Sequence, residues 1–259
     1  MAVNPQLATV GGHVLPPDVL QSIRSASSTT GVDFKFLVAQ ASLESGFQTD
    51  VKSKRSSAAG LFQFTSQTWL EMMREHGAKY GQADLAREIV TQANGKLGAS
   101  SKAIEKRILD LRKDVSLSAQ MAAELTKSNA TQLEKALRRK PSVADLHLSM
   151  LLGATGAVRL LKAHQSNGTA AAAALLPAAA RQNPRIFYDN GHTPKTVAAV
   201  YRRIAQSIAG PIRQVAAPEH AEISHTATVP PATAGTDIPL KPGVGLIASV
   251  APTPIDRKS

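Results

Sequence analysis

Apolar residues recur at the spacing of amphipathic helices from about residue 18 to residue 209, and this pattern constrains the fold more than any other feature. Residues that favour helix N-termini stand before several of these segments, namely Asp33, Thr65, Asp114 and Ser142. Between Ser45 and Phe64 the helical period disappears, and we expect a loop or small hairpin there. The pattern therefore predicts a mainly α fold.

The expected helices have boundaries set by these capping residues and by breaks in the apolar period. They cover residues 18–27, 33–44, 65–76, 82–93, 101–113, a long helix from 114, then 142–152, 155–165, 169–176 and 193–209.

The chain divides by composition into three parts. We expect a flexible N-terminal segment at residues 1–17, one folded domain at 18–210 and a disordered tail at 211–259. The tail is rich in Pro, Ala and Thr and has no helical period, as in "TVPPATAGT". Its acidic and basic residues balance, so the chain's net charge of +11 resides in the folded part.

Composition excludes several functional classes. The chain has no cysteine, which rules out disulfide frameworks, thiolate metal sites and a cysteine nucleophile. Aromatic residues make up 4% of the chain, which argues against binding nucleic acid mainly by base stacking. The net positive charge favours a polyanionic partner such as nucleic acid, anionic lipid or bacterial cell wall. No metal-ligand motif occurs, and we expect no metal and no cofactor.

No segment has the length and hydropathy of a membrane span. The longest stretch of small apolar residues, Ala170 to Ala180, is interrupted by Pro177. The first basic residue is Arg24, and glycines and prolines interrupt the apolar segment before it. This start lacks the pattern of a secretory signal, so we expect either a route other than Sec export or a true start upstream of this one.

Glu44 is the strongest candidate for a catalytic residue. It ends a largely apolar segment between Leu43 and Phe47, and Phe62 and Phe64 follow in the loop. Apolar surroundings raise the pKa of a carboxyl group, which a general acid near neutral pH requires. We expect Glu44 to be shielded, with a raised pKa, at the floor of a groove.

The residues around Glu44 resemble the catalytic signature of the soluble, lysozyme-like lytic transglycosylases. "ESGF" is followed by "VKS", by "GLFQF" and by "TSQTW". The family positions are filled in order by Glu44, Ser45, Ser53, Gly60, Leu61 and Gln63. The segment before Gly60 is one residue longer than the usual spacing. Weaker similarity covers "DLHLSMLLGATGAVRLLKAH", with a small-residue turn near Gly153, and "NPRIFYDNGHTPKTVAAVY".

The resemblance implies a lysozyme-like helical domain that cleaves the β-1,4 bond between N-acetylmuramic acid and N-acetylglucosamine in peptidoglycan. It implies Glu44 as catalytic residue, and it places Ser53 and Gln63 where they can bind an N-acetyl group or the catalytic carboxyl group. Phe64, from the same loop, is a further candidate for binding substrate. A tyrosine common in the family is replaced at the matching position by Met150. His147 and Tyr188 are the candidates to take its place at the substrate.

The number of carboxylates separates two chemical outcomes. Glycosidases that hydrolyse need two carboxylates, roughly 5 to 9.5 Å apart, but no Asp or Glu occurs from Val51 to Leu70. A single Glu44 predicts a 1,6-anhydro product, formed with help from the substrate's N-acetyl group. Hydrolysis, as in a muramidase, is the alternative, with Asp50 or another carboxylate as the second group.

Two other function classes and several biological settings stay open. A catalytically silent wall-binding or secretion-scaffold protein would keep the fold, whereas a nucleic-acid-binding protein has no motif in its favour. The expected partners are peptidoglycan glycan strands and, in one setting, a secretion or flagellar apparatus. Phage lysis and general wall turnover are other settings. We expect the protein to be a monomer without a nucleic-acid partner. We expect it in the periplasm or cell wall, and a cytoplasmic pool is also consistent with the sequence.

Overall fold

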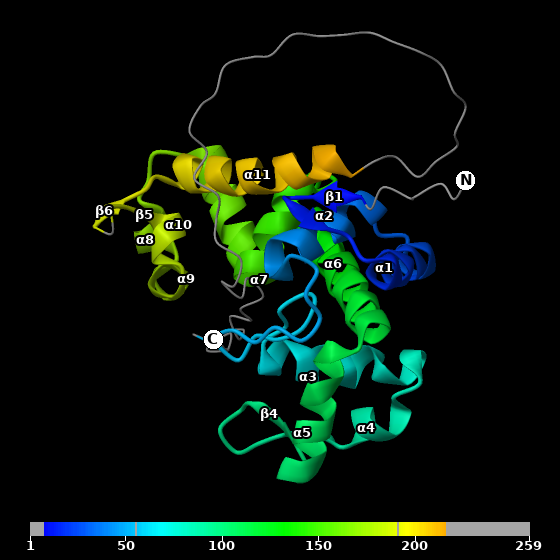
Figure 1. The fold of residues 1–259 in the computed structure, drawn as a ribbon. Coiled ribbons are helices and arrows are strands. Elements are labelled where there is room, and N and C mark those ends of the chain that lie inside the picture. The colour runs from blue at the N-terminus through cyan, green and yellow to red at the C-terminus, as the bar shows by residue number, and fades with distance from the viewer. Residues whose placement is uncertain (1–7, 55, 191, 216–259) are drawn as a thin grey trace, which may run out of the picture.

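The computed structural model describes residues 8–54, 56–190 and 192–215, and these form a predominantly helical molecule with three two-stranded antiparallel sheets (Figure 1). None of the helices in the described part of the chain is long and apolar enough to cross a membrane. The expected mainly α class is confirmed.

The helices and strands follow one another in this order. In the first half they are β1 Thr9–Val10, β2 His13–Val14, α1 Pro17–Thr30, α2 Phe34–Ser45, α3 Ser66–His76, the 3₁₀ turn Gly77–Tyr80, α4 Ala83–Arg87, β3 Ile89–Thr91, β4 Leu97–Ala99, α5 Lys102–Asp110 and the 3₁₀ turn Leu111–Lys113. In the second half they are α6 Val115–Leu137, α7 Val143–Ser166, α8 Ala172–Leu175, α9 Pro177–Gln182, α10 Pro184–Phe187, β5 Tyr188–Asp189, β6 Thr193–Pro194 and α11 Val197–Gln214.

Local side-chain capping explains where the main helices begin. The carboxylate of Asp33 accepts a hydrogen bond from the Phe36 amide at 2.8 Å, and Thr65 and Asp114 cap α3 and α6 in the same way. Ser142 and Asp145 form a reciprocal capping box at the start of α7. All four expected capping residues are confirmed.

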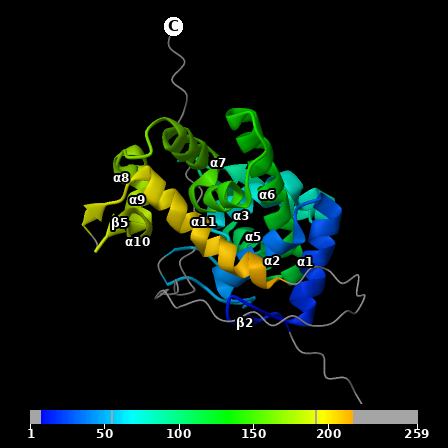
Figure 2. The same ribbon diagram turned by 90° about the horizontal axis from the view of Figure 1, so that it is seen from above.

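The core consists of two hydrophobic clusters. The first joins α1, α2, α3, α5 and the N-terminal half of α6, around residues such as Phe36 and Trp69. The second joins the C-terminal end of α6 with α7 to α11, around residues such as Phe187 and Leu160. Helix α11 packs on both α7 and α2, and it runs from the α8–α10 region to the N-terminal hairpin (Figures 1 and 2).

Several boundaries differ from the sequence-based expectations. The expected helix 82–93 ends at Arg87, because residues 89–91 pair with 97–99 across the turn at Gly95, whose φ is +77°. Residues 8–17 are ordered rather than flexible, since the β1–β2 hairpin buries Val10 and Leu15 against the first cluster.

Helix α11 differs at both ends, because residues 193–194 form β6 and the helix begins at Val197, and because it continues past the expected boundary at residue 210. It ends at Gln214, whose side chain accepts a hydrogen bond from the Gly11 amide at 2.5 Å. Residues 1–7 and the remainder of the expected tail, 216–259, lie outside the described residues.

Helix α7 spans two expected helices. The backbone of Gly153 is non-helical, at φ +68° and ψ 163°, so the helix is kinked there before its second part continues to Ser166. The small-residue turn expected near Gly153 is therefore confirmed.

Candidate active site

Glu44 lies in the last turn of α2 and is almost completely buried, with 1% of its surface exposed. Nine of the twelve residues of this helix are buried, which explains why its sequence is apolar on all sides. The helix ends because Gly46 adopts a left-handed conformation, at φ +60°, and the buried Phe47 follows at φ +68°. The expected shielding of Glu44 is confirmed, whereas the groove and the raised pKa stay predictions.

Ser45 joins the end of α2 to the loop that follows. Its hydroxyl group donates to the carbonyl oxygen of Leu61 at 2.8 Å. Within the loop, Ala59 bridges to Lys52 on one side and to Phe64 on the other. The expected loop or small hairpin is thus a folded segment that returns to the helix carrying Glu44.

Gln63 closes the same segment from inside. Its side-chain amide donates to the carbonyl oxygens of Val51 at 3.1 Å and Gly60 at 2.8 Å, and the residue has no exposed surface. Gln63 adopts a positive φ of 48°, which costs energy for a residue with a side chain. The two hydrogen bonds from Nε2 hold the side chain in this position, while Oε1 is buried without a hydrogen-bond partner in the described structure.

Arg112 is a site residue that the sequence did not indicate. It is 6% exposed, and Nη1 donates to the carbonyl oxygens of Ser57 at 2.5 Å and Phe64 at 3.1 Å. Burial lowers the pKa of this guanidinium. The glycine at position 60 is required here, since a Cβ atom would lie 2.0 Å from the Arg112 carbonyl oxygen. Arg112 therefore fixes both ends of the segment 57–64.

The other loop candidates have different surroundings. Ser53 is half-buried, and its amide donates to the Ala58 carbonyl oxygen at 2.9 Å. Phe64 is fully buried and packs edge-on against Trp69, with ring centroids 5.2 Å apart. Direct substrate contacts by Ser53, Gln63 and Phe64 stay predictions.

His147 is buried inside the protein rather than on the surface. The ring is 3% exposed, with Nδ1 2.6 Å from Oε1 of Gln40 and Nε2 3.1 Å from the hydroxyl oxygen of Ser207. Burial lowers the pKa of His147 to about 4, so the ring is neutral near pH 7. Gln40 is one helical turn before Glu44 on α2. The structure thus places His147 as a link between α7, α11 and α2.

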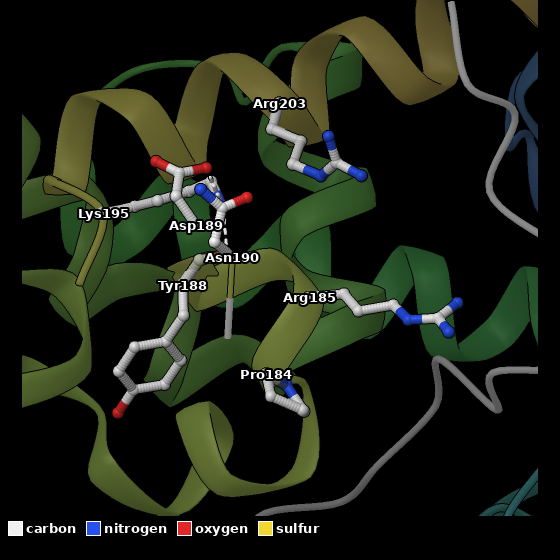
Figure 3. Close-up of a pocket in the computed structure, with 7 residues that line it drawn as sticks. All are labelled: Pro184, Arg185, Tyr188, Asp189, Asn190, Lys195 and Arg203. Carbon is white, nitrogen blue, oxygen red and sulfur yellow. Dashed lines mark hydrogen bonds and ion pairs between the residues drawn. The ribbon is translucent and has the colours of Figure 1, made fainter. Parts of the chain in front are cut away.

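Met150 and Tyr188 lie in different places. Met150 is 2% exposed, and its sulfur is 3.6 Å from the side-chain nitrogen of Asn129 on α6. Tyr188 begins β5 and lines a pocket between α10 and α11 (Figure 3). A substrate-binding role for Tyr188 or His147 stays a prediction.

A helical domain with a buried glutamate at the end of one helix, followed by a loop hydrogen-bonded back to that helix, is of the lysozyme-like kind. Residues 21–87 match the family model of the transglycosylase SLT domain. The match begins in α1, includes α2, the loop and α3, and ends with α4, about a quarter of the chain. The resemblance to soluble lytic transglycosylases is confirmed, and it supports peptidoglycan as substrate and its cleavage as activity.

Proposed function

We propose that the chain cleaves the N-acetylmuramic acid β-1,4-N-acetylglucosamine bond of peptidoglycan with Glu44 as its single catalytic residue. The observation that carries the proposal is the 1% exposure of Glu44 at the point where the family loop is hydrogen-bonded to α2 through Ser45. A carboxyl group in such surroundings is favoured in its protonated form, which is the form a general acid needs.

In the proposed reaction Glu44 acts first as an acid and then as a base. Its proton goes to the glycosidic oxygen as the bond from C1 breaks, and the N-acetyl oxygen of the muramic acid stabilises the positive charge at C1. The Glu44 carboxylate then removes the proton of the C6 hydroxyl group, and O6 bonds to C1. The product is a 1,6-anhydro sugar, and Glu44 is protonated again.

Hydrolysis is the second candidate outcome, and Asp50 is the nearest carboxylate in sequence that it could use. Asp50 is exposed, in contrast to Glu44. Both outcomes fit the wall-acting chemistry of the family, and we propose a site of action in the periplasm or cell wall.

Mass spectrometry of released muropeptides tests the reaction directly. Digestion in ¹⁸O-labelled water is expected to give products without label that resist borohydride reduction. Products that gain ¹⁸O and are reduced would show hydrolysis instead. The Glu44→Gln variant should release neither product, and a catalytically silent wall-binding protein would release neither even with Glu44 intact.

A further inference from the structure

A pocket in the second half of the chain carries an excess of positive charge that the protein itself does not neutralise. Its volume is about 450 Å³, within the range of ligand sites. The lining residues are Pro184, Arg185, Tyr188, Asp189, Asn190, Lys195 and Arg203. Figure 3 shows that α10, the β5–β6 hairpin and α11 supply them.

Only one of the three cations in this pocket has an acidic partner among the described residues. Nζ of Lys195 forms an ion pair with Asp189 at 2.8 Å and also donates to the Tyr188 carbonyl oxygen. The side chain of Arg185 forms no ion pair or hydrogen bond with any of the described residues. Two positive charges are thus left for a ligand.

Arg203 gives the most specific indication of what that ligand is. Its Nε atom is buried and has no hydrogen-bond partner in the described structure. A buried N–H group without a partner destabilises the folded protein, and more so when the group is charged. A carboxylate that accepts two parallel hydrogen bonds is the ligand that best satisfies a guanidinium.

The pocket is also placed along the helix that reaches the candidate active site. Arg203 lies one turn before Ser207 on α11, and Ser207 is hydrogen-bonded to His147. His147 contacts Gln40, one turn before Glu44. These contacts connect α11 to α2 through buried side chains, so the pocket and Glu44 lie on elements that pack against one another.

We propose that this pocket binds a carboxylate of the peptide stem of peptidoglycan, with Arg185 and Arg203 as the groups that recognise it. The inference rests on the proposed function, because that function supplies a glycan with acidic peptide branches. Tyr188 also lines the pocket, and its ring points away from Arg185 and Arg203 (Figure 3).

The test measures binding of a free synthetic stem peptide, which requires no cleavage. The proteins are the native chain, Arg203→Gln, Arg185→Gln and the control Arg202→Gln, which removes one exposed cation from the same helix. We expect calorimetry to show a dissociation constant at least ten times higher for Arg203→Gln and several-fold higher for Arg185→Gln. The Arg202→Gln variant should bind as the native chain does. Binding should weaken as salt is added.

Three results would overturn the proposal. The first is that the native chain does not bind the peptide. The second is that a peptide with amidated carboxylates binds as tightly as the unmodified peptide. The third is displacement of the peptide by inorganic phosphate at a lower concentration than the peptide itself, which would identify a phosphate site. Peptide binding by a chain that releases no muropeptides would contradict the proposed reaction and leave this site in place.

Discussion

The Nδ1 atom of His147 lies 2.6 Å from Oε1 of Gln40, so a neutral imidazole on α7 donates a hydrogen bond to the helix that ends in Glu44. Nε2 lies 3.1 Å from the hydroxyl oxygen of Ser207 on α11, so three helices meet at one ring. Protonation of the second ring nitrogen would place a positive charge inside the protein, so burial disfavours the charged form of His147.

His147 is expected to make the stability of the protein depend on pH. Its pKa is about 4 in the folded state and 6.5 when unfolded, so the unfolded state binds more protons below pH 6.5. Stability is complete above that pH and is lost as the pH falls toward 4. Because of His147, the free energy of unfolding should fall by about 2 kcal/mol when the pH is lowered from 7.5 to 5.

Urea denaturation of His147→Gln at both pH values measures this contribution. The variant should lose less stability on acidification than the native chain by that amount. His192→Gln, which alters an exposed histidine, should keep the native pH dependence. Parallel curves for native protein and His147→Gln would contradict the assignment.

Glu44→Gln should reduce the rate of peptidoglycan cleavage by about 10²-fold to 10⁴-fold or more, because an amide cannot transfer the proton. The two side chains have nearly the same shape, so the melting temperature should stay close to that of the native chain. Zymography and a turbidity assay on purified walls measure the activity. Asp50→Asn is the matched control, and a comparable loss in that variant would favour the two-carboxylate hydrolysis.

Arg112→Met should destabilise the protein by about 3 kcal/mol, because the carbonyl oxygens of Ser57 and Phe64 lose charged donors. The segment 57–64 should then lose its fixed position relative to Glu44, which lowers kcat more than it raises KM. Lys113→Met, the exposed neighbour, should leave both stability and kinetics unchanged. Equal kinetics for native protein and Arg112→Met at a temperature where both are folded would exclude this role.

A chain shortened after Val215 should keep its melting temperature, because the residues removed have a composition that buries little apolar surface. Shortening after Gly210 should lower it, since this also removes the buried Pro211 and Val215 and the hydrogen bond between Gln214 and Gly11. Differential scanning calorimetry of the two shortened chains makes the comparison. An equal melting temperature for both would mean that the end of α11 contributes nothing to stability.

The sequence by itself determined the elements whose causes are local. Asp33, Thr65, Asp114 and Ser142 begin helices because a cap involves only the next three residues. The burial of Glu44 also followed from its neighbours in sequence, because a helix that is apolar on all sides must lie inside. One local signal went unused, since Asn94-Gly95 indicates the hairpin that replaced the end of the expected helix 82–93.

The tertiary structure alone decided which distant residues meet. Nothing in the sequence around Arg112 distinguishes it from other basic residues. Only the fold brings it to the carbonyl oxygens of Phe64 and Ser57, which are 48 and 55 positions away. The sequence makes His147 a candidate to contact the substrate, yet the packing of α11 against both α7 and α2 encloses it beside Gln40, 107 positions away. Residues 211–214 have the composition of the tail, and their place in α11 depends on a contact between Gln214 and Gly11, which are 203 positions apart. Contacts of such separation depend on how the helices pack, which no local pattern of residues records.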